Sequence, residues 1–197
     1  MNNITENKIL NAIKFFVKNT NNVGRTKLFK LLYFLDFMFF KEYGLSVTLY
    51  DYYTFPFGPV PKQLFDQIAN DNLPDFLKNE IFFMEEQNEE NEDEYKQFKA
   101  VLKNPKIDLS CFAPYEKEML EKVTEIFKYA SAKDITEASH LKNHPWDKTK
   151  NSRGMFQKID YELAIDEDSE LDIDDVKEYL ELQKELSYIE NLRKKIK

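Results

Sequence analysis

Cysteine, glycine and histidine are scarce in this chain of 197 residues, which has one, four and two of them respectively. The single cysteine, Cys111, cannot form an intramolecular disulfide and speaks against a cysteine-based metal site. The glycines, among them Gly24, Gly58 and Gly154, are too scattered to build a phosphate-cradling loop. The sequence therefore gives no support to a disulfide scaffold or to a nucleotide-binding loop.

Long apolar runs are also missing. Residues 31–40 are apolar except for Asp36, but ten residues are too few for a membrane span, which needs roughly 20. Residues 1–6 lack the basic and apolar regions of a secretory signal. We therefore expect a soluble, cytoplasmic protein that does not associate with membranes.

Basic residues are outnumbered in most of the chain. The net charge is -8, and residues 1–70 carry 8 Lys and Arg against 5 Asp and Glu, so residues 71–197 carry 20 against 31. A duplex-binding protein needs a basic face to displace counterions from phosphates. Nucleic acid is therefore not the expected partner, although the mildly basic first third could meet an acidic one.

What the chain does contain is enough apolar sequence for one folded domain with an extension, since 42% of its residues are hydrophobic and 15% aromatic. Periodicity predicts helices over residues 4–18, 25–43, 61–68, 114–130 and 131–140, and strands over residues 45–55, 81–84 and 95–102. Gly44 is suited to cap the second helix in a left-handed conformation. The acid-rich run 85–94 is interpreted as a solvated hairpin tip. The fold class that we predict is α+β: a mainly helical single domain with a small antiparallel β-sheet and a long C-terminal helix.

The C-terminal segment has a pattern of its own. From Val176 to Ile196 apolar residues recur at spacings of 3 and 4, which predicts a helix of about 24 residues with one apolar stripe. We therefore divide the chain into a domain, residues 1–168, and a helical extension, residues 169–197. The stripe has to cover the domain's own core, a second copy in a homodimer, or another partner.

Catalytic and metal-binding groups are hard to assemble from this sequence. His140 and His144 are four residues apart, but Pro145 moves His144 out of helical geometry and no third ligand is evident. Cys111 between Leu109 and Phe112 is typical of a small buried side chain rather than a nucleophile. We predict no catalytic, cofactor-binding or metal-binding residues, and no enzymatic activity.

Asp36 departs most from its surroundings, because a carboxylate among aromatic and aliphatic residues is costly to bury without donors. One interpretation is that it accepts hydrogen bonds from a turn or helix start, near residues 58–62, and so locks the core. The other is that it lines a binding groove. We favour the first.

Aromatic residues crowd the expected strand 45–55. Alternation assigns Tyr53 and Phe55 to one side and Tyr50 and Tyr52 to the other, outward side. Because tyrosine is enriched in the centres of interfaces, Tyr50 and Tyr52 are candidates for partner contact.

Several blocks, in a fixed order, resemble the Panacea or SocA-like antitoxin family. They are Lys27-Leu-x-Lys-Leu-Leu-Tyr-x-x-Asp36, then Tyr43-Gly44, then Phe57-Gly-Pro-Val-Pro61, then a helix ending at His140 and followed by Trp146. The resemblance extends over about residues 5–165, and it departs from the family at Thr54-Phe55 and at Ser139. The candidate motif or partner-binding residues are Tyr33, Asp36, Tyr50, Tyr52, Phe57, Gly58, Pro59, Pro61, His140 and Trp146.

The resemblance implies an antitoxin, which neutralises by direct contact a protein toxin encoded beside it. It also leaves open an adaptor that delivers the toxin to a bacterial protease. It implies no cofactor and no catalytic residue, and it suggests that the shared motifs maintain a scaffold while variable surfaces select the toxin. A hydrolase or metal enzyme is the alternative from another class.

Overall fold

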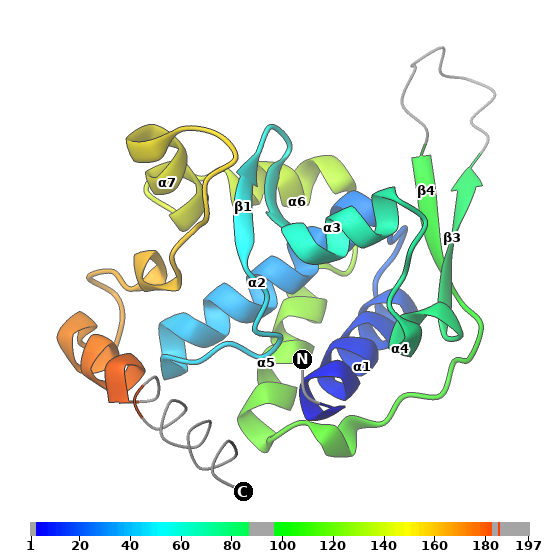
Figure 1. Ribbon diagram of the computed structural model, residues 1–197, viewed down its shortest axis with the longest axis horizontal. Coiled ribbons are helices and arrows are strands. Elements are labelled where there is room, and N and C mark those ends of the chain that lie inside the picture. Colours follow the sequence, from blue (N-terminus) through cyan, green and yellow to red (C-terminus); the bar gives the residue numbers. More distant parts are fainter. Residues whose placement is uncertain (1–2, 87–96, 183–184, 186–197) are drawn as a thin grey trace, which may run out of the picture.

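The computed structural model describes residues 3–86, 97–182 and 185 (Figure 1). The helices are α1 (Asn3–Asn19), α2 (Arg25–Tyr43), α3 (Lys62–Ala69), α4 (Asp75–Lys78), α5 (Pro114–Phe127), α6 (Ala132–Ser139) and α7 (Pro145–Arg153), with 3-10 helices η1 (Leu109–Cys111) and η2 (Tyr161–Ala164). The strands are β1 (Tyr52–Phe55), β2 (Gly58–Pro61), β3 (Ile81–Glu86) and β4 (Gln97–Leu102). The mainly helical α+β class is confirmed, but the strands form two separate antiparallel hairpins rather than one small sheet.

Helix α2 is the centre of the domain. Figure 1 shows it crossing the middle of the molecule, with the β1–β2 hairpin and α6 on one side and α1 and α5 on the other. Its residues are buried almost all round, as its nearly uninterrupted apolar sequence predicts. Gly44 ends the helix at φ 67° and donates its N–H to the Phe40 carbonyl at 2.8 Å, so the predicted left-handed cap is confirmed.

The strand predicted over residues 45–55 is wrong in its first half. Regular pairing begins only at Tyr52, and Leu49 has φ 59°, which breaks the alternation of side chains. Tyr50 and Tyr52 therefore point into the core, with 2% and 0% of their surface exposed, and the expectation that they face outward was wrong.

Both edges of β1 are paired. One edge bonds to β2, with Tyr52 opposite Pro61 and Phe55 opposite Gly58. The other edge is covered by residues 156–159, whose backbone exchanges hydrogen bonds with Thr54 and Tyr52. Residues far apart in sequence thus fix the β1–β2 hairpin, here called the motif hairpin because it contains the Phe57–Pro61 motif, to the rest of the domain.

Other boundaries differ slightly from those expected. Helix α5 ends at Phe127, three residues early, and the predicted capping box is present, with Ser131 and Asp134 bonding to each other's backbone N–H. The expected hairpin tip at residues 85–94 lies mostly outside the described residues. Over the part of the chain that the structure describes, no helix combines the length and apolarity that crossing a membrane requires.

The C-terminal helix is described only at its start. Residues 173–182 are helical, and Val176 is buried beside Gly44, with 3.5 Å between Val176 Cγ2 and the position that a Gly44 Cβ would occupy. Tyr179 and Leu182 are 41% and 52% exposed. The first apolar position of the stripe therefore packs on the domain itself. The rest of the expected helix lies outside the described residues, and the homodimer stays a prediction.

Candidate functional site

Three residues of the motif that resembles the SocA-like family lie along one side of α2. Lys30, Tyr33 and Asp36 follow one another at intervals of three, which places them along the same side of the helix. Each lies under a different part of the chain: Asp36 under the loop before β1, Lys30 under the β1–β2 turn, and Tyr33 between them. All three are at most 2% exposed.

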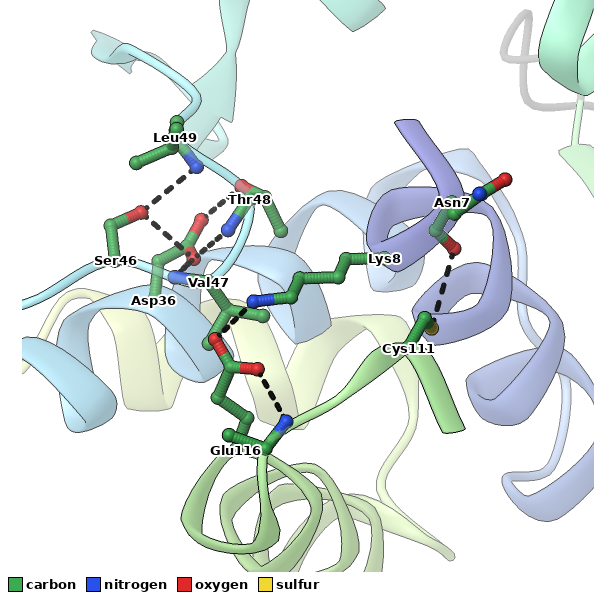
Figure 2. A network of polar contacts seen from close by, with 10 residues as sticks. Asn7, Lys8, Asp36, Ser46, Val47, Thr48, Leu49, Cys111 and Glu116 are labelled. Atoms are coloured by element: carbon green, nitrogen blue, oxygen red, sulfur yellow. Dashed lines mark hydrogen bonds and ion pairs between the residues drawn. The ribbon is translucent and has the colours of Figure 1, made fainter. Parts of the chain in front are cut away.

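Asp36 is enclosed by the loop that leads into β1, as Figure 2 shows. Its Oδ1 accepts from the backbone N–H groups of Val47 (2.9 Å) and Thr48 (2.8 Å) and from the Ser46 hydroxyl (3.1 Å). Its Oδ2 accepts from the hydroxyls of Tyr52 (2.7 Å) and Thr48. The predicted hydrogen bonds from a turn are therefore present, but they come from residues 46–52 and not from residues 58–62.

The Asp36 cluster comprises Asp36, Ser46, Thr48, Tyr52 and Tyr161. Asp36, Thr48 and Tyr52 have no exposed surface, Ser46 and Tyr161 are partly exposed, and no basic side chain among the described residues pairs with the carboxylate. Burial raises the pKa of Asp36, and its hydrogen bonds oppose that shift. Burial and the Asp36 charge also raise the pKa of Tyr52 and Tyr161 well above 10.0. The tyrosines therefore remain neutral donors, and the cluster is a fixed structural network.

The Lys30 cluster comprises Lys30, Gly58, Ser139, His140 and Trp146. Lys30 Nζ donates to the Pro59 carbonyl at 3.0 Å, directly below the β1–β2 turn. Gly58 has φ 91°, and a Cβ there would lie 2.7 Å from Lys30 Cε, 2.7 Å from Ser139 Oγ and 2.9 Å from His140 Nε2. Only glycine fits this position, because three side chains converge on it and the backbone is left-handed.

The imidazole of His140 lies flat on the indole of Trp146, with ring centroids 3.9 Å apart and an interplanar angle of 19°. His140 Nε2 and Trp146 Nε1 are buried and have no hydrogen-bond partner among the described residues. The backbone of Trp146 hydrogen-bonds to the Tyr33 hydroxyl, which links this cluster to the middle of α2. The start of α7 is thereby tied to the central helix.

Burial also governs the charges in this cluster. Desolvation lowers the pKa of Lys30 to about 7, and burial together with the nearby Lys30 lowers the pKa of His140. A neutral amine beside a hydroxyl and an imidazole is capable of proton transfer, but Ser139 is fully buried and donates to the Thr136 carbonyl at 2.7 Å. A surface cavity of ≈ 370 Å³ lies elsewhere, against α1 and α5. The arrangement therefore favours a scaffold role for these motif residues.

Replacing Lys30 by methionine should change how stability depends on pH. A lysine in the unfolded chain has a pKa of about 10.4, whereas that of folded Lys30 is about 7. Between these pH values the unfolded chain binds more protons, so the free energy of unfolding rises with pH, by at most about 1.4 kcal/mol per pH unit. Below pH 7 both states are protonated and the slope vanishes.

Urea denaturation at pH 7, 8 and 9 measures this slope. We expect the wild-type protein to gain stability relative to Lys30→Met across that range. Parallel stability curves for the two proteins would show that Lys30 is not desolvated.

The other sequence candidates are distributed as follows. Pro59 and Pro61 are buried with Gly58, whereas the Phe57 side chain is 65% exposed at the hairpin turn. His144 precedes α7 as its N-cap residue.

Among the described residues no group of three or more His, Cys, Asp or Glu side chains is placed to hold a metal ion. Burial raises the pKa of the half-buried Cys111 thiol, which disfavours the reactive thiolate.

Three residues of this region were missed from the sequence. Lys30 was quoted as part of a motif but not singled out, although a lysine in an apolar helix carries the same signal as Asp36. Ser139 was noted only as a departure from the family. Phe156, 60% exposed with φ 61°, lies against the outer edge of β1 and had no sequence signal, since its conformation is fixed by distant partners.

Comparisons with known proteins give one family. A search of curated proteins and a search of solved structures found no significant match. A family model described as "Antitoxin SocA-like, Panacea domain" matches residues 28–147, more than half of the chain. That range contains both clusters on α2, apart from Tyr161, and the whole β1–β2 hairpin. The chain therefore belongs to the SocA-like Panacea antitoxin family.

Proposed function

We propose that this protein is an antitoxin that neutralises a cognate protein toxin, encoded by an adjacent gene, by binding it directly. The observation that carries the proposal is the family match over residues 28–147. The arrangement supports it, because the buried motif residues fix the hairpin and α7 in place, and none of them lines the surface cavity against α1 and α5. A rigid surface held by a buried network is suited to binding a protein with little rearrangement.

Masking is the mode of neutralisation that we favour. A bound antitoxin that covers the toxin's active surface needs no catalytic group of its own. Delivery of the toxin to a protease would need, in addition, a second surface for that protease. The two modes differ in whether the toxin survives in the cell.

Co-expression with the adjacent gene tests the proposal. We expect the neighbouring product to arrest growth alone, this protein to restore growth, and the two to co-purify as a stable complex. Rescue in a strain that lacks its cytoplasmic proteases would support masking, and loss of rescue there would support the adaptor. Rescue without any complex, together with a chemically altered toxin product, would contradict direct binding and favour an enzyme.

A further inference from the structure

Three large apolar side chains are exposed at or near the turn of the β1–β2 hairpin. Phe57, Leu141 and Phe156, here called the hairpin face, are 65%, 54% and 60% exposed. Phe57 precedes Gly58, against which His140 packs, and Leu141 follows His140. The Phe156 ring lies 5.1 Å from the ring of Phe55, near the same turn. Figure 1 shows the turn between α6 and α7.

Phe156 occupies a conformation that its type rarely adopts. A bulky residue with φ 61° is strained by about 1–3 kcal/mol, whereas glycine or asparagine takes this conformation more easily. Three hydrogen bonds hold it: Phe156 N–H to the Thr54 carbonyl (2.6 Å), Gln157 N–H to Thr54 Oγ1 (3.0 Å) and Thr54 N–H to the Gln157 carbonyl (2.9 Å). Because the ring remains mostly in solvent, its burial does not repay the strain, and stability does not explain a phenylalanine here.

The backbone of the hairpin offers no edge to a partner. Strand β1 is paired on both sides, and β2 contains Pro59 and Pro61, which have no N–H to donate. A partner is therefore recognised through side chains rather than through an added strand.

The rim of this face is basic in an acidic protein. Residues 52–62 and 141–158 contain six Lys and Arg and one Asp, although the whole chain has a net charge of -8. Three of the six are paired with acids just outside these segments, namely Lys62 with Asp66, Lys158 with Asp51 at 2.6 Å and Arg153 with Asp160 at 2.8 Å. Lys148 Nζ donates to the Leu163 carbonyl at 3.1 Å. Lys150 Nζ lies 4.9 Å from the centre of the Trp146 ring and is otherwise exposed. Lys142 and Lys150 are therefore the two exposed cations of these segments whose charge is available to a partner.

We propose that the hairpin face is the surface that contacts the toxin, and that it takes a toxin surface with an apolar centre and an acidic rim. This assignment rests on the proposed function. Aromatic anchors in the middle and charges at the edge are the usual division of labour in protein interfaces. A single-stranded nucleic acid would also suit aromatic and basic groups, but the net charge of -8 opposes it.

Binding of the purified product of the adjacent gene to three variants tests the assignment. Phe57→Ser and Phe156→Gly should each weaken binding at least about tenfold, because each removes an aromatic anchor. Phe156→Gly should also leave the melting temperature unchanged or higher, since it relieves the strained backbone. A merely structural role for Phe156 predicts the opposite, a lower melting temperature. Tyr129→Ser, on an exposed aromatic beyond the end of α5, is the matched control and should bind normally.

A double variant, Lys142→Glu with Lys150→Glu, tests the contribution of positive charge to toxin binding. Both positions are exposed. This double variant should bind more slowly than the wild-type protein, and its association rate should depend less on salt concentration. Normal toxin binding by all these variants would overturn the assignment while leaving the antitoxin function intact. The assignment would also be overturned if the variants lost affinity for a single-stranded oligonucleotide, used as a probe, while they bound the toxin normally. If the wild-type protein does not bind the toxin at all, the proposed function itself fails.

Discussion

Replacing Gly58 by alanine is expected to destabilise the domain by about 2–5 kcal/mol, a large part of the roughly 5–15 kcal/mol that holds a domain folded. The new methyl group would lie within 3 Å of Lys30, Ser139 and His140. These side chains are tied to the Pro59 carbonyl, the Thr136 carbonyl and the Trp146 ring, so they do not yield without loss of a contact. Chemical denaturation measures the change.

The matched control is Gly154→Ala. Gly154 has φ 89°, close to the 91° of Gly58, but no atom lies within 4 Å of where its Cβ would be. Both variants place an alanine at a φ near 90°, which L side chains rarely adopt, and only Gly58→Ala adds crowding. If the two are equally destabilised, the convergence of side chains on Gly58 has no energetic importance.

Asp36→Ala is expected to lower the free energy of unfolding by about 3–5 kcal/mol, because it leaves buried donors of the enclosing loop without an acceptor. The two backbone N–H groups of Val47 and Thr48 are the most affected, because the direction of each is fixed by the loop backbone. The three hydroxyls that bond to Asp36 can rotate toward other partners.

Asparagine provides a graded comparison at the same position. Its carbonyl oxygen can replace Oδ1, which accepts both backbone N–H groups, and its amide can donate to the hydroxyls of Thr48 and Tyr52. Asp36→Asn should therefore be much more stable than Asp36→Ala in thermal and urea melts. An unchanged melt for Asp36→Ala accompanied by lost toxin binding would instead place Asp36 in the interface.

Local signals in the sequence were sufficient for the central helix. The apolar run and the glycine at its end predicted both its burial and its last residue, Tyr43. The hairpin was harder, because residues 45–51 alternate as a strand would. Such a segment pairs with another strand only if its backbone N–H groups are not taken by another acceptor. Here the N–H groups of Val47 and Thr48 donate to Asp36 instead. The period of apolar residues carries no information about such a distant acceptor, so Tyr50 and Tyr52 were predicted to face outward although they are buried.

The candidate residues show a similar division. The family resemblance brought together Tyr33, Asp36, Gly58, His140 and Trp146, which the structure places in connected buried clusters. It did not distinguish support from contact surface, because side chains of either kind can belong to a recurrent motif. Phe156 lay beyond the matched blocks, and its display depends on hydrogen bonds to Thr54 about a hundred positions earlier. Long-range pairing of this kind has no local pattern.

The pairing of β1 with residues 156–159 also defines how this domain can be moved between proteins. The family model ends at residue 147, yet Ile159 is fully buried and its N–H donates to the Tyr52 carbonyl at 2.8 Å. The family model begins at residue 28, after α1, whose Ile9, Ile13 and Phe16 have no exposed surface. A fusion or chimera cut at the limits of the family model would remove one covering layer and uncover a strand edge, which invites aggregation. We therefore expect a transferable unit to include at least α1 and the residues through Ile159.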